Sequence, residues 1–161
     1  MAYDGTDYAG FQVQSNAQTV QGELERALST VCDGAVRVTG AGRTDAGVHA
    51  SGQVIDFRTA STLDGLSIGR GVNALLPEDI AVSALEPAAE DFHARFSATG
   101  RTYEYRIRHG RERDHARTFE GIVAVNDRAM AGPSAPARGL CLIAVEYGES
   151  RMTRDLDEAD E

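Results

Sequence analysis

Residues 40–50 read GAGRTDAGVHA and join two β-type runs of the chain. Three glycines in eight residues predict a loop whose backbone takes angles that side chains resist, or a backbone that something approaches closely. Within this loop the carboxylate of Asp45 follows two residues after the guanidinium of Arg43. An Asp in a glycine-rich turn is most often a turn former, and the two charges could equally make a structural ion pair. The extra glycines, Arg43 and the nearby His49 favour a functional loop.

The order of the expected elements predicts an α+β fold. Apolar residues recur at helical spacing over 19–33, with Thr19 as cap and Gly34 as the end. A second helix follows a capping-box pattern at 61–64 and stops before Pro77. We expect strands at 36–39, 53–58, 80–85, 102–108, 121–125 and 139–147. This β-loop-α-β-β-α-β-β order predicts a ferredoxin-like fold, with a mostly antiparallel sheet and helices on one face.

Composition and charge limit the class of protein. A chain of 161 residues suits one domain with a real core. Its net charge of −9 argues against a polyanion partner. The distribution softens that argument, because residues 93–117 hold seven Arg against three acids, while residues 146–161 hold seven acids. We interpret that acidic run as a solvated, disordered tail.

The ends of the chain and its apolar runs predict a location. The first five residues have neither a basic region nor an apolar stretch, so we expect no signal peptide. The longest apolar run, 140–145, is far too short to cross a bilayer. We therefore expect a cytoplasmic protein without a membrane partner.

Two residue types on the expected strand 102–108 could contact nucleic acid. Tyr103 alternates with charged residues, and a tyrosine in this position is most often core packing. Arginines flank it, however, and aromatic rings with arginines also stack splayed bases and hold their phosphates.

Asp45 is the candidate nucleophile, because an ionised carboxylate can attack a sugar carbon or an activated base to give a covalent intermediate.

Several blocks together resemble the tRNA pseudouridine synthase A family. The loop at 40–50 is similar to the active-site signature of that family, and FHARFSA at 92–98, followed by Arg101 and Tyr103, is similar to its second signature. Further similar blocks lie at 3–12, 73–77 and 139–142. The resemblance covers nearly all of residues 3–108 and resumes near residue 131.

The resemblance implies an isomerase that converts uridine to pseudouridine at positions 38–40 of tRNA, in the anticodon stem-loop. Asp45 matches the catalytic Asp, and its attack at C1′ of the sugar or at C6 of the base stays open. Tyr103 would stack on the base and help to move the C5 proton. Arg43 would fill the place of the flipped nucleotide or orient Asp45. The resemblance implies no metal and no cofactor, and it implies a homodimer that binds tRNA across both subunits.

The remaining substrate-binding residues follow from the same matched blocks. They are Arg95, Arg101, His49 and Gln12, with Tyr103 and Arg43. Arginines of the 95–117 segment would meet phosphates.

The chain departs from the family pattern between about residues 108 and 131, where family members carry much of a second subdomain. We expect a catalytic subdomain at 1–108, a truncated remnant of the second subdomain at 109–148 and the acidic tail at 149–161. Because a preorganised pocket makes a carboxylate effective, the alternative is an impaired RNA-binding or dimerising remnant of such an enzyme. The first strand should also be clipped, since only residues 1–3 precede the first loop.

Two other interpretations find little support. The pair Gly40 and Gly42 lacks the third glycine and the following helix of a dinucleotide-binding loop. Asp45, His49 and His93 have no paired-ligand spacing, which argues against a metal site.

Overall fold

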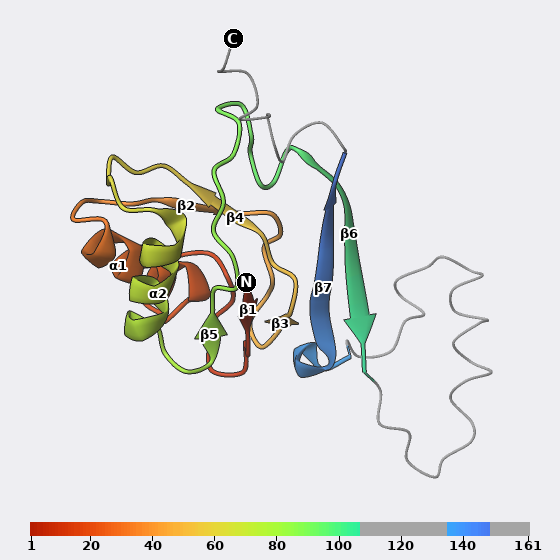
Figure 1. Cartoon of the computed structure of the whole chain (residues 1–161). Coiled ribbons are helices and arrows are strands. Elements are labelled where there is room, and N and C mark those ends of the chain that lie inside the picture. The colour runs from red at the N-terminus through yellow and green to blue at the C-terminus, as the bar shows by residue number, and fades with distance from the viewer. Residues whose placement is uncertain (107–134, 149–161) are drawn as a thin grey trace, which may run out of the picture.

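A computed structural model of the chain describes residues 1–106 and 135–148 (Figure 1). The expected strand 121–125, most of the segment 109–148 and the acidic tail 149–161 lie outside the described residues. No helix of the described part is both long enough and apolar enough to cross a membrane.

Helix α1 (Val20–Val31) begins where its capping residue predicts. The Thr19 hydroxyl accepts a hydrogen bond from the backbone N–H of Gly22, at 3.2 Å. The end differs from the expectation, because Asp33 and not Gly34 takes the left-handed conformation, with φ of 51°. Aspartate tolerates this region better than most side chains do, so the chain can turn one residue earlier. The buried face is formed by Val20, Leu24, Ala27 and Leu28.

Helix α2 (Gly65–Leu75) begins later than the capping-box pattern predicts. Its cap is Asp64 and not Ser61, since the Asp64 carboxylate accepts from both the N–H and the hydroxyl of Ser67. Those hydrogen bonds to the ionised form hold the pKa of Asp64 below its ordinary value. The helix ends as expected, with Leu76 extended before Pro77.

A five-stranded mixed sheet carries the fold, in the order β5-β1-β3-β7-β6. Its strands are β1 (Ala2–Tyr3), β3 (His49–Ala50), β5 (Ile80–Ala81), β6 (Ala98–Tyr105) and β7 (Leu140–Tyr147). Only the β3–β7 pair is parallel among the described pairings. A separate antiparallel pair joins β2 (Val38–Gly40) to β4 (Ile55–Phe57). The expected α+β class with a mostly antiparallel sheet is confirmed.

The core lies between the two helices and the short central strands. Helices α1 and α2 lie side by side on the same side of β1 and β5 (Figure 1). Their apolar faces meet the sheet at Tyr3, Ile80 and Leu142, all of them buried. The antiparallel pair of β6 and β7 extends the sheet beyond this helical layer. β7, which the sequence places in the remnant, is hydrogen-bonded between β3 and β6, and the division into domains stays a prediction.

Strand β6 begins earlier than expected and contains an irregularity that matters for the site. Thr102 pairs with Ala144, but Tyr103 pairs with Leu142, so one residue of β7 is skipped. Such a bulge re-aims side chains relative to a regular strand. The Tyr103 side chain is 44% exposed and does not belong to the core. The commoner interpretation of Tyr103 as core packing is therefore wrong.

Tyr147 fastens the end of β7 to the segment that precedes β6. Its hydroxyl donates to the carbonyl oxygen of Ala94 at 2.8 Å, and its ring packs on Phe92 with centroids 5.1 Å apart. Burial raises the pKa of Tyr147 to about 12.

This raised pKa predicts a loss of stability in alkali. From the ordinary value of 10.0 up to about 12, the unfolded chain releases the Tyr147 proton while the folded chain keeps it. The free energy of unfolding should therefore fall as pH rises through this window, and fall less steeply in Tyr147→Phe. Urea unfolding at pH 8, 10 and 11 measures both slopes, and parallel slopes would contradict the assignment.

Candidate functional site

The loop between β2 and β3 contains a tight turn that begins at Asp45. The N–H of Val48 donates to the carbonyl oxygen of Asp45 at 3.1 Å, and Gly47 has φ of +78°. A positive φ at the third turn position alone is typical of a type II turn, which favours glycine there. The Asp45 side chain is exposed at the start of this turn. The local sequence therefore presents the carboxylate to solvent.

A buried side-chain amide holds the preceding part of the loop. Gln53, with 0% of its surface exposed, donates from Nε2 to the carbonyl oxygen of Gly42 at 2.8 Å. Its Oε1 accepts from the Gly42 N–H at 3.2 Å. Both backbone polar groups of this buried glycine are thus paired by one side chain. The alternating pattern of the sequence predicts Gln53 only as the first residue of a strand and gives no signal for this role.

A second buried contact fixes the loop closer to Asp45. The hydroxyls of Tyr3 and Thr44 lie 2.7 Å apart, and burial raises the pKa of Tyr3. The carbonyl oxygen of Thr44 accepts from the N–H of Phe11 at 2.9 Å. Thr44, the residue before Asp45, is therefore held in place through both its side chain and its backbone. Sequence alone carried no signal for these partners, which lie far apart along the chain.

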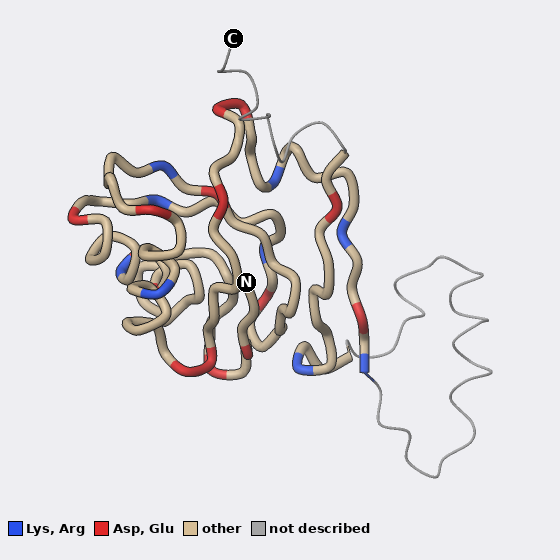
Figure 2. The backbone as a smooth tube through the Cα atoms, viewed as in Figure 1, with Lys and Arg blue, Asp and Glu red and all other residues tan. Residues whose placement is uncertain are grey.

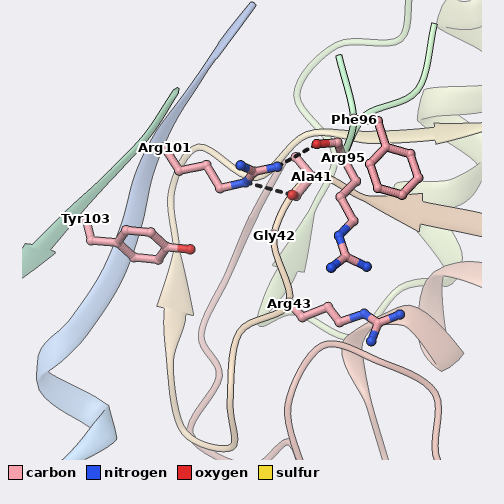
Figure 3. Close-up of a pocket in the computed structure, with 7 residues that line it drawn as sticks. All are labelled: Ala41, Gly42, Arg43, Arg95, Phe96, Arg101 and Tyr103. Carbon is pink, nitrogen blue, oxygen red and sulfur yellow. Dashed lines mark hydrogen bonds between the residues drawn. The ribbon is translucent and has the colours of Figure 1, made fainter. Parts of the chain in front are cut away.

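Four of the expected site residues line one hollow of about 410 Å³. They are Arg43, Arg95, Arg101 and Tyr103, and Ala41, Gly42 and Phe96 complete the lining (Figure 3). Figure 3 shows the Tyr103 hydroxyl directed from β6 toward the loop at Gly42. A Cβ added to Gly42 would lie 3.4 Å from that hydroxyl. The tyrosine hydroxyl and the glycine loop are thus neighbouring parts of the lining.

Arg101 has a positioning role in the structure. Its Nε donates to the carbonyl oxygen of Ala41 at 2.8 Å, and its terminal nitrogen donates to that of Arg95 at 2.7 Å (Figure 3). The guanidinium thereby joins β6 to the loop and to the segment before β6. Its role in binding substrate stays a prediction.

A second hollow of about 300 Å³ adjoins the first. It shares Arg43, Arg95 and Phe96 with the first hollow and adds Gln12 and His93 among its lining residues. Gln12 is thereby brought beside two of the expected arginines.

Asp45 and His49 lie outside both linings. The expected ion pair between Arg43 and Asp45 is not formed, since the ion pairs of the described residues join other groups. The His49 Nδ1 lies 3.0 Å from an Asp4 carboxylate oxygen, and its Nε2 lies 3.0 Å from the Arg138 carbonyl oxygen. His49 thus links the first loop to the short 3-10 helix Ala137–Gly139 that precedes β7, and its role in binding substrate stays a prediction.

The hollow carries a concentrated positive charge. Arg43, Arg95 and Arg101 have no carboxylate partner within the part of the chain that the structure describes. Basic positions are spread along the backbone in Figure 2, and folding brings Arg43 beside Arg95 and Arg101, which are six residues apart in the sequence. Guanidinium groups suit bidentate contacts with phosphate oxygens. Together with Tyr103, the arrangement suits a nucleotide whose base stacks and whose phosphate is neutralised.

No group of three His, Cys, Asp or Glu side chains among residues 1–106 and 135–148 is placed to hold a metal ion.

Comparison with known proteins matches the N-terminal part of the chain to a family. Residues 1–97 match the family described as tRNA pseudouridine synthase. A protein of Latilactobacillus sakei named tRNA pseudouridine synthase A is 54% identical over 108 residues, which are 66% of this chain and 43% of that protein. Proteins of the same name from Pseudoalteromonas translucida and a Geobacillus species are 51% and 50% identical, over 65% and 71% of this chain. The matched region spans 40% and 46% of those two proteins, so the chain covers less than half of these relatives.

The Gln53 contact predicts a large loss of stability on substitution. Gln53→Met keeps the volume but leaves two buried polar groups of Gly42 unpaired, at about 1–3 kcal/mol each. The free energy of unfolding should fall by roughly 2–6 kcal/mol in urea denaturation. Gln53→Glu should lose at least as much, because it buries a carboxylate whose second oxygen would face the carbonyl oxygen of Gly42. The exposed Gln18→Met is the matched control and should change stability by less than about 0.5 kcal/mol; an equal loss in Gln18→Met would refute the role.

Proposed function

Because the chain belongs to the tRNA pseudouridine synthase family, we propose that it isomerises uridine to pseudouridine in tRNA, at positions 38–40, with Asp45 as nucleophile. The single observation that carries this proposal is the first hollow. It combines a glycine loop, three arginines without described carboxylate partners, and the exposed ring of Tyr103. The loop that lines it continues, two residues after Arg43, into the turn that presents Asp45.

The target uridine has to leave its stack in the anticodon stem-loop, which costs a few kcal/mol. Stacking on Tyr103 would compensate part of that cost, at about 1–3 kcal/mol per base. Arg43 and Arg95 would neutralise the phosphates on either side. For the reaction to proceed, the extruded nucleotide has to reach the turn at Asp45, which follows the loop that lines the hollow.

Two routes for the covalent step remain open, and both break and form the same bonds overall. The Asp45 carboxylate forms a bond either to C1′, displacing the base, or to C6 of the base. In each route the N1–C1′ bond breaks, a C5–C1′ bond forms and the bond to Asp45 is released. The proton on C5 leaves, with help from Tyr103, and N1 ends protonated. Neither route consumes an oxidant or a reductant.

A second candidate function is tRNA binding without turnover. One observation favours it: the Asp45 side chain lines neither hollow of the described residues. The arginines and Tyr103 would then hold RNA while the nucleophile lies outside the enclosed space.

The partners we propose are tRNA and a second copy of the chain, in the cytoplasm where tRNA is modified. β6 is an edge strand of the five-stranded sheet among the described pairings. Edge strands present unpaired backbone groups that favour pairing with another chain. The measured mass in solution tests the dimer.

The first test of the function is loss of turnover without loss of RNA binding. Asp45→Asn removes the nucleophilic charge at nearly constant shape, so tritium release from tRNA containing C5-tritiated uridine should fall to background. Affinity for the same tRNA should stay equal or rise, because one negative charge is lost. Release at the wild-type rate in Asp45→Asn would exclude Asp45 as nucleophile. Background release by the wild type, with RNA binding intact, would favour the second candidate.

The second test concerns the arginine cluster. The affinity for an anticodon stem-loop RNA should fall with salt, with a slope of about 0.7–0.9 per phosphate contact on a log–log plot. Arg43→Gln should lower the magnitude of the slope by about 0.7–0.9, the value of one phosphate contact. The control, Arg70→Gln, changes an exposed arginine of α2 that lines neither hollow and should leave the slope unchanged. Equal slopes in all three proteins would contradict phosphate binding at Arg43.

A further inference from the structure

Phe96 is the most exposed large hydrophobic side chain among the described residues. Its side chain is 76% exposed, against 44% for Tyr103 and 65% for Leu66. An isolated exposed apolar residue needs no explanation by itself. What distinguishes Phe96 is how its ring is held and what surrounds it.

The ring of Phe96 is oriented by its neighbours in sequence. The His93 ring lies against it with centroids 4.3 Å apart, and the Arg95 guanidinium carbon lies 5.6 Å from its centroid. The backbone of residues 93–97 forms a hydrogen-bonded turn under the ring, since the Ser97 N–H donates to the carbonyl oxygen of His93 at 2.8 Å. An aromatic ring fixed in this way loses little conformational entropy when a ligand stacks on it.

The position of Phe96 joins the two hollows. Phe96, Arg43 and Arg95 are the lining residues that both hollows share. A strand of RNA that places one nucleotide in the first hollow would therefore pass this ring on its way to the second. Arg43 and Arg95, without carboxylate partners in the described part of the chain, would meet its phosphates.

We propose that Phe96 is a second base-stacking position, which takes an unpaired nucleobase of the RNA next to the nucleotide stacked by Tyr103. The inference rests on the proposed function, since it assumes an RNA substrate in the first hollow. An aromatic ring beside arginines is the usual combination for holding single-stranded nucleic acid, because every base has a face to stack and a phosphate to neutralise. The ring would stabilise the opened loop once the target uridine has left its stack.

The test uses the full chain and an anticodon stem-loop RNA with 2-aminopurine beside the target uridine. Stacking on Phe96 should quench the 2-aminopurine fluorescence on binding. Phe96→Ala should lose this quenching. It should also bind the RNA roughly 5- to 150-fold more weakly, because that is the affinity one stacked base contributes. The salt slope should stay at the wild-type value, because no charge is removed. Phe96→Tyr keeps the ring and should restore quenching and affinity.

Leu66→Ala is the matched control, since Leu66 is 65% exposed on α2, and it should bind as the wild type does. Wild-type affinity and quenching in Phe96→Ala would overturn the stacking role while leaving the proposed function intact. A shift of Phe96→Ala from dimer to monomer at unchanged RNA affinity would assign the ring to a second copy and also overturn it. Absence of RNA binding by the wild type would refute the proposed function and this inference together.

Discussion

The pairing of one buried amide with one buried glycine is the contact on which the site depends. Gln53 satisfies both backbone groups of Gly42, and these two residues are eleven positions apart. A buried polar group without a partner costs more than a hydrogen bond normally contributes. Moving the loop away from Gln53 would break both hydrogen bonds, so the contact holds the loop in place. Arg43 extends from that position into both hollows.

The net charge of the chain and the charge of the first hollow have opposite signs. The chain carries a net charge of −9, which would repel a polyanion at long range. At close range the hollow presents Arg43, Arg95 and Arg101 without described carboxylate partners. Within a Debye length of about 8 Å at physiological salt, these near charges outweigh distant acids. The local field, and not the net charge, fits an RNA ligand.

The arginine of β6 shows how a positioning contact also concentrates charge. Arg101 donates to the carbonyl oxygens of Ala41 and Arg95, so one guanidinium fixes the distance between the loop and the segment before β6. The bulge beside it turns Tyr103 out of the core and over Gly42. The same few residues of β6 therefore set both the charged side and the aromatic side of the hollow.

The sequence by itself determined the local elements: the cap at Thr19, the stop before Pro77 and the glycine that the turn at Asp45 requires. These depend on backbone angles and hydrogen bonds within a few residues, so sequence rules reach them. Motif resemblance also pointed to most residues of the hollow. Only the tertiary structure decided that Arg101 reaches Ala41 across 60 positions, that Asp45 lies outside both linings, and that Phe96 is exposed. Burial and long-range pairing depend on how the whole chain packs, which no short stretch encodes.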